Sequence, residues 1–187
     1  EYGGFMCNTD RDGTNISTGK RTWYEGRGIW VYSFLYNKLS QDPKHLEVAR
    51  ESVEFIMPHR PQSGERWAGS YTREGEPVSG PGDIYANLFI ANGLAEYAQT
   101  PGNEQYWDTA KEILIDSMRI YDDPGYDYTV GYGPDVPTPR GARVLGHWMV
   151  LLRLVTQMLE SRSDPGVEAV SARCVDAIMN YHYNPGF

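Results

Sequence analysis

Three times along the chain, a helical segment that is apolar on nearly every side is followed by one that is apolar along a single stripe. The first kind is expected over 21–39, 83–99 and 144–159, and the second over 44–57, 103–121 and 164–181. A helix that is apolar all round is buried, whereas an amphipathic helix lies at the surface. The pattern predicts an all-α protein in which each of three hairpins pairs an inner helix with an outer one.

The breaks between these segments carry ordinary helix and turn signals. Asp42-Pro43 and Asp164-Pro165 each open an amphipathic segment with proline at the first helical position, and Pro101-Gly102-Asn103 separates another pair. Short β-hairpins are expected in the loops, one at the Asp12-Gly13 turn and one over 67–78.

Alternating inner and outer helices are typical of the (α/α)6 toroid, a ring of six helical hairpins. Three hairpins are counted in the 187 residues. We therefore expect residues 1–187 to form one domain, a partial (α/α) barrel shaped as an arc.

Composition narrows the classes of partner. The net charge is −8 and basic residues do not cluster along one face, so a nucleic-acid partner is not expected. Neither a membrane-spanning apolar run nor a basic-then-apolar leader is present. Cys7 and Cys174 fit neither a disulfide framework nor a zinc site, so we expect no metal, reduced thiols and a cytoplasmic location.

Arg27 is the first candidate for chemistry, because it lies on the Trp23–Trp30–Phe34 stripe of an expected inner helix. A guanidinium there needs a partner. One interpretation is a clamp that donates to sugar hydroxyls or to a developing oxyanion. The other is a buried ion pair with Asp83 or Glu25.

His147 is the second candidate, at the start of the apolar run 147–152. A histidine at the end of an inner helix suits acid–base catalysis near neutral pH. The alternative is a core histidine whose ring nitrogens are satisfied by the protein.

Aromatic and amide side chains gather near the second inner helix. Tyr85 and Asn87 begin it, and Trp67 precedes it. With Trp23 they would form a polar, stacking rim for a sugar, although core packing and capping also explain them. Phosphate-binding glycine loops and GxSxG elbows are absent, so no cofactor is expected.

The opening of the chain resembles the opening of N-acylglucosamine 2-epimerases. The segments 84–89 and 93–97 are similar to that family's next inner helix, and 147–152 to the one after. The residues that carry the resemblance at the start are Tyr2-Gly3-Gly4-Phe5, Asp10-Arg11-Asp12-Gly13, Lys20, Trp23, Glu25-Gly26-Arg27 and Trp30-Val31-Tyr32-Ser33.

The resemblance implies metal-free 2-epimerisation or isomerisation of an open-chain sugar through an enediol(ate). It implies that Arg27 stabilises the oxyanion and that His147 corresponds to the histidine of the cellobiose 2-epimerase branch. The family's Gly-His-x-x-Glu motif does not occur in 1–187, and Val150 stands where Gly146-His147 would need Glu. We expect the chain alone to have little or no epimerase activity because the C-terminal catalytic histidines are missing.

Two further functions stay open. One is a non-catalytic carbohydrate-binding or interaction module, and the other is an (α/α)6 glycoside hydrolase, which needs two positioned carboxylates. An incomplete ring would expose apolar helix edges, so homo-oligomerisation is also possible. The loop over 122–139 is expected to set the sugar specificity, but its residues do not indicate which sugar is bound.

Overall fold

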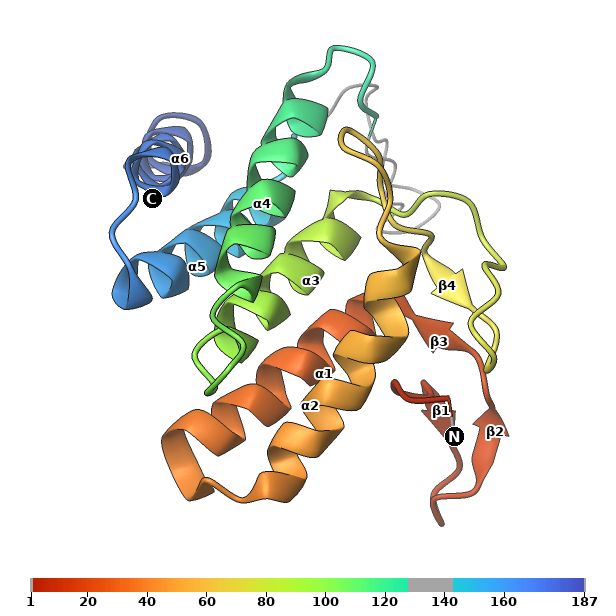
Figure 1. The fold of residues 1–187 in the computed structure, drawn as a ribbon. Coiled ribbons are helices and arrows are strands. Elements are labelled where there is room, and N and C mark those ends of the chain that lie inside the picture. The colour runs from red at the N-terminus through yellow and green to blue at the C-terminus, as the bar shows by residue number, and fades with distance from the viewer. Residues whose placement is uncertain (1, 128–142, 187) are drawn as a thin grey trace.

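Residues 2–127 and 143–186 are described by a computed structural model (Figure 1). Most of the loop over 122–139, which was expected to set sugar specificity, lies outside them. The described residues form six α-helices, which are α1 (Thr22–Phe34), α2 (Pro43–Ile56), α3 (Ile84–Tyr97), α4 (Tyr106–Asp122), α5 (Leu145–Ser161) and α6 (Pro165–Ala177). Wider π-helical turns extend α1 through Leu35–Ser40 and α6 through Ile178–His182, and a 3-10 turn, Met57–His59, follows α2.

The helices pair as the sequence predicts. α1 packs on α2, α3 on α4 and α5 on α6, and α3 also contacts both α1 and α5. The layer α1–α3–α5 is therefore the inner layer, and α2, α4 and α6 form the outer one. Figure 1 shows the N-terminus beside the short strands on one side of the molecule and the C-terminus beyond α6 on the other. The expected all-α architecture of three helical hairpins is confirmed.

Aspartates fix the starts of three helices. The Oδ1 atom of Asp42 accepts from Lys44 N, that of Asp83 accepts from Tyr85 N, and that of Asp164 accepts from Gly166 N and Val167 N. These bonds satisfy backbone N–H groups that have no acceptor inside the helix.

Two glycines allow α1 and α3 to approach closely. A Cβ on Gly26 would overlap the backbone of Phe89, and a Cβ on Gly93 would lie 2.6 Å from the Gly26 carbonyl oxygen. The missing side chains thus fix the register of the two helices at this crossing.

The strands follow the sequence only in part. β1 (Asn8–Thr9) and β2 (Asn15–Ser17) form the expected hairpin around the Asp12-Gly13 turn. The turn at Gly75 is present with φ +108, but β4 (Ser70–Tyr71) pairs with β3 (Lys20–Arg21). The two sides of the expected second hairpin are joined by an isolated bridge, Tyr71 to Pro77, and by hydrogen bonds from Thr72 N to Glu76 O and from Val78 N to Ser70 O. This β3–β4 pair ties the start of α1 to the segment before α3.

Burial differs between the inner helices. Every residue of α3 except Phe89 is buried. The prediction that α1 is buried on nearly every side is wrong, because α1 buries only Thr22, Glu25, Gly26, Ile29 and Ser33. In the part of the chain that the structure describes, no helix is both long and apolar enough to cross a bilayer.

Candidate functional site

The stripe of α1 that carries Arg27 is partly accessible to solvent. Arg27 is exposed and Trp23 is 36% exposed, while Trp30 and Phe34 are half-buried. The buried residues of α1 pack on α2 and α3, and the stripe borders this buried face. A row of aromatic side chains with one guanidinium is therefore open to a ligand.

Arg27 is not held by an ion pair. Within residues 2–127 and 143–186, no carboxylate lies within 4 Å of its guanidinium, so the expected alternative of a pair with Asp83 or Glu25 is wrong. Its Cζ atom instead lies 4.3 Å from the centroid of the Phe89 ring. A cation–π contact, unlike an ion pair, places no acceptor oxygen on the N–H donors of the guanidinium, so they can bind a ligand oxygen.

A chain of aromatic contacts connects Arg27 to His147. Phe89 stacks on Tyr85 with ring centroids 6.2 Å apart, and Tyr85 stacks on His147 at 4.7 Å. Trp23 meets Tyr85 and Phe89 edge-on at 5.5 and 5.7 Å. The two residues predicted to carry the chemistry thus belong to one cluster, built by α1, α3 and α5.

His147 lies inside this cluster, with 0% of its surface exposed. Tyr121 and Tyr126 meet its ring at centroid distances of 5.5 and 6.2 Å. Burial, with a smaller effect from the nearby positive charge of Arg143, lowers its pKa from 6.5 to about 4. The imidazole is therefore neutral at pH 7.

Trp67 and Asn87 lie beneath the surface, 1% and 2% exposed. Asn87 Oδ1 accepts from Trp67 N at 3.2 Å, and its Nδ2 donates to Glu65 O at 3.2 Å. The amide therefore joins α3 to the loop before it. Their predicted contact with a sugar stays a prediction, as does that of Tyr85, which is 8% exposed.

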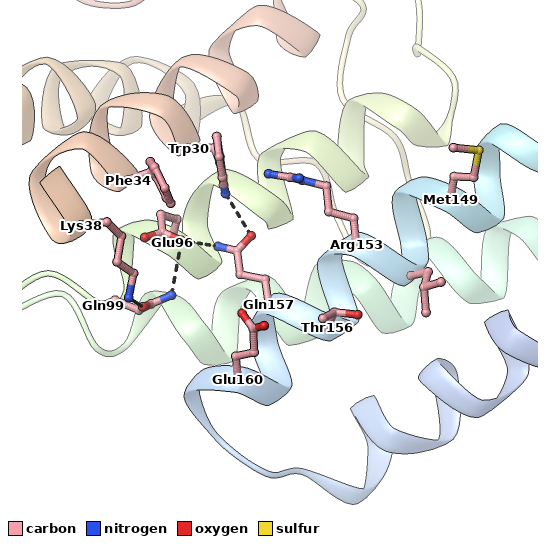
Figure 2. Close-up of a pocket in the computed structure, with 11 residues that line it drawn as sticks. Trp30, Phe34, Lys38, Glu96, Gln99, Met149, Arg153, Thr156, Gln157 and Glu160 are labelled. Carbon is pink, nitrogen blue, oxygen red and sulfur yellow. Dashed lines mark hydrogen bonds between the residues drawn. The ribbon is translucent and has the colours of Figure 1, made fainter.

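A groove that the sequence did not predict lies between α1 and α5 (Figure 2). Its volume is about 550 Å³, within the range of small-molecule sites. Trp30 and Phe34 line it from α1, Arg153 and Gln157 from α5, and Glu96 from α3. The groove continues the exposed stripe of Arg27, because Trp30 follows Arg27 by one helical turn.

Glu96 is the centre of a polar network in this groove. It is 3% exposed and accepts from Asn37 Nδ2 and Gln157 Nε2, each at 2.8 Å. Gln157 Oε1 in turn accepts from Trp30 Nε1 at 3.0 Å and from Asn92 Nδ2. Burial raises the pKa of Glu96, and the Asn37 hydrogen bond opposes that shift. A glutamate inside an otherwise apolar segment was the only sequence signal of this network.

Glu25 forms a second buried polar centre, between α1, α2 and the N-terminal segment. Ser52 Oγ donates to its Oε2 at 2.7 Å, and Phe5 N donates to its Oε1 at 2.9 Å. Burial raises its pKa to about 7, although both hydrogen bonds and the charge of Lys20 oppose the shift. Lys20 Nζ donates to the carbonyl oxygen of Gly3 at 2.6 Å. These bonds hold the N-terminal segment against the helices.

Solved structures of sugar epimerases share this arrangement. A sugar epimerase from a ruminal bacterium superposes with a TM-score of 0.82 at 18% identity, covering 99% of this chain and 50% of that chain. Cellobiose 2-epimerase from Bacillus thermoamylovorans gives a TM-score of 0.76 at 18% identity, covering 100% and 51%. The fold is thus that of half of a sugar epimerase.

The sequence comparisons give the family. Residues 3–128 match the family model of N-acylglucosamine 2-epimerase (GlcNAc 2-epimerase), and the chain belongs to that family. The N-acylglucosamine 2-epimerase of Bos taurus is 28% identical over 182 residues, which are 94% of this chain and 42% of that protein. Cellobiose 2-epimerase of Dictyoglomus turgidum is 29% identical over 90 residues. The chain spans less than half the length of the curated relatives it matches.

Proposed function

We propose that this chain supplies part of the substrate-binding face of a sugar 2-epimerase or isomerase that acts on the open-chain sugar. The observation that carries the proposal is Arg27, an exposed guanidinium among aromatic side chains and without an ion-pair partner in the described residues. Aromatic faces bind the apolar faces of a sugar, and a guanidinium binds its oxygens.

In the proposed reaction, a base removes the proton from the carbon beside the carbonyl. The electron pair of that C–H bond forms the enediolate double bond, and the carbonyl π electrons move onto oxygen. Arg27 N–H groups stabilise the resulting negative charge. Return of a proton to the opposite face of the same carbon re-forms the carbonyl and gives the epimer. Its delivery to the neighbouring carbon, with transfer of the adjacent hydroxyl proton to the former carbonyl oxygen, converts the aldose to the ketose.

His147 is proposed as a proton-transfer group of this reaction. A neutral imidazole can accept a proton, and a pKa of about 4 keeps the ring neutral at pH 7. Tyr85 covers the ring in this structure, so the role requires Tyr85 to move. The other proton transfers are proposed to use histidines outside residues 1–187.

Trp23 is the predicted sugar-binding residue with the most accessible ring. We propose that it stacks on the substrate, while Tyr85, Asn87 and Trp67 complete the rim from below. The thiols of Cys7 and Cys174 form no disulfide in this structure, which supports a cytoplasmic location. Exposed apolar side chains support self-association; they are Tyr24 and Val31 on α1 and Met179 after α6.

The test is Arg27→Ala in the complete gene product, assayed with N-acetylmannosamine, mannose and cellobiose in deuterated water. Loss of an oxyanion donor is expected to lower kcat by about 100- to 1000-fold and to slow deuterium incorporation beside the carbonyl. Arg21→Ala, at an exposed position just before α1, is the matched control. Unchanged turnover in Arg27→Ala refutes the clamp, and turnover by residues 1–187 alone refutes the need for histidines elsewhere.

A binding-only function is the second candidate, favoured by the full burial of His147. It predicts that the complete gene product binds one of these sugars but exchanges no proton with deuterated water. Titration of tryptophan fluorescence alongside the exchange assay separates the two functions, because Trp23 lies beside Arg27 on the exposed stripe.

A further inference from the structure

Phe89 is unusual within α3, because it is the one residue of that helix that is not buried. Its ring lies under the Arg27 guanidinium, whose Cζ atom is 4.3 Å from the ring centroid. Since no carboxylate of the described residues pairs with Arg27, the contact with this ring gives the guanidinium its direction.

The position of Phe89 is itself fixed, by two ring contacts and by the contact of its backbone with α1. Tyr85, one turn earlier on α3, stacks on it, and Trp23 packs edge-on against it. Its backbone lies directly against Gly26, where a Cβ would overlap it. Gly26 immediately precedes Arg27, so the helix crossing places the Arg27 backbone and the Phe89 ring in a set register.

We propose that Phe89 is a positioning residue that orients the Arg27 guanidinium by a cation–π contact. An ion pair would place carboxylate oxygens on the N–H donors of the guanidinium, whereas an aromatic ring supplies no acceptor oxygen. Phe89 thus holds the cation in place and leaves its donors to a substrate oxygen. The value of this orientation for turnover rests on the proposed function, but the orientation itself does not.

The competing role for Phe89 is a stacking platform for the sugar. Arg27 covers one face of the ring and Tyr85 stacks with it on α3, while Trp23 occupies an edge. The ring already contacts Arg27, Tyr85 and Trp23, so these contacts favour positioning.

The first experiment uses the 187-residue chain and follows the Arg27 side chain by NMR. In the wild type, the ring current of Phe89 is expected to shift the Arg27 δ and ε protons upfield and to restrict their motion. Phe89→Leu and Phe89→Met remove both effects, and Phe89→Tyr retains them. Phe34→Leu, on the same stripe but in contact with Trp30, is the matched control and leaves them unchanged. Identical Arg27 signals in wild type and both aliphatic variants overturn the proposal.

Pentafluorophenylalanine at position 89 separates cation–π attraction from packing, because it keeps the ring shape and reverses its quadrupole. Release of Arg27 in this variant supports the proposal, and retention of its order shows packing alone and overturns it. This readout also decides the question if the aliphatic variants fail to fold.

The second experiment measures turnover in the complete gene product. Phe89→Leu is expected to lower kcat/KM about two- to fivefold, the factor that an exposed cation–π contact supplies, and Phe89→Tyr to restore it. If NMR shows release of Arg27 while neither Phe89→Leu nor Arg27→Ala affects turnover, positioning stands and the proposed function fails. If Arg27→Ala abolishes turnover and NMR shows no effect of Phe89, the function stands and positioning fails.

Discussion

Trp30 on α1 donates its indole N–H to Gln157 Oε1 on α5 at 3.0 Å, joining the first and third inner helices across 127 residues of sequence. Gln157 also donates to Glu96 Oε2 at 2.8 Å, so one amide side chain links all three inner helices (Figure 2). Residues that line the groove therefore also hold its helices together.

Gln157→Ala is expected to lower the free energy of unfolding by about 1–3 kcal/mol, because it removes a donor to the buried Glu96 carboxylate and the acceptor of the Trp30 indole. Urea unfolding followed by tryptophan fluorescence measures the effect. Thr156→Ala, at the exposed neighbouring position, is the control and should change stability little. Equal stabilities of the two variants would show that the network contributes nothing.

Glu25 is expected to make stability fall as pH rises. Its pKa is raised from 4.5 to about 7 in the folded chain, so the folded state binds the proton more tightly. The stabilisation is complete below pH 4.5 and is lost as pH rises through 7, a total of about 3 kcal/mol. Glu25→Gln, which keeps an acceptor for Phe5 N, removes this pH dependence.

The measurement is the difference in unfolding free energy between wild type and Glu25→Gln from pH 4.5 to 8. Glu51→Gln, at an exposed position on α2, is the matched control. A constant difference across the range would contradict a raised pKa at Glu25.

His147 is expected to make the free energy of unfolding rise with pH, which is opposite to the effect of Glu25. Its pKa is lowered from 6.5 to about 4, so its contribution is present above pH 6.5 and is lost as pH falls through 4. An NMR titration of the imidazole resonances checks the value, with the other three histidines as internal references. A midpoint near 6.5 for His147 would mean that the ring is solvated.

Between pH 4.5 and 6.5 the effects of Glu25 and His147 on the free energy of unfolding oppose each other. The stability of the wild-type chain is therefore expected to change little with pH in this range.

Gly93→Ala tests the crossing of α1 and α3. The added Cβ would lie 2.6 Å from Gly26 O and 2.9 Å from Ile29 Cβ, so the helices must separate, at an expected cost of about 1–3 kcal/mol. Gly80→Ala is the control, since a Cβ there meets nothing within 4 Å. Thermal unfolding of both variants gives the comparison, and a more stable Gly93→Ala chain would mean that helix propensity outweighs the close approach.

The helices and their order were predictable because their signals are local. Apolar periodicity and the Asp42-Pro43 and Asp164-Pro165 starts place helix boundaries within a few residues of α2 and α6. The β3–β4 pair was not predictable, since Lys20 and Tyr71 meet only once the helices have packed.

The residue types of the candidate site could be chosen from the sequence, but the burial and contacts of these residues were harder to predict. Sequence patterns made Arg27 and His147 candidates and placed Arg27 inside the core, where the structure exposes it, whereas the core position considered for His147 agrees with its burial. Which half of an apolar helix is covered depends on its neighbours, and here α2 and α3 cover the face that borders the stripe of Arg27. The partners of Glu96 lie on two other helices, so no local pattern reveals them.

The central position of α3 has a consequence for how the chain opens. With all its residues but Phe89 buried and with contacts to α1, α4 and α5, α3 cannot exchange its amide hydrogens unless its neighbours detach. The α5–α6 hairpin has α3 as its main helical neighbour and can detach first. Slow exchange should therefore concentrate in α3, and the α5–α6 hairpin should behave as a separate, less protected folding unit.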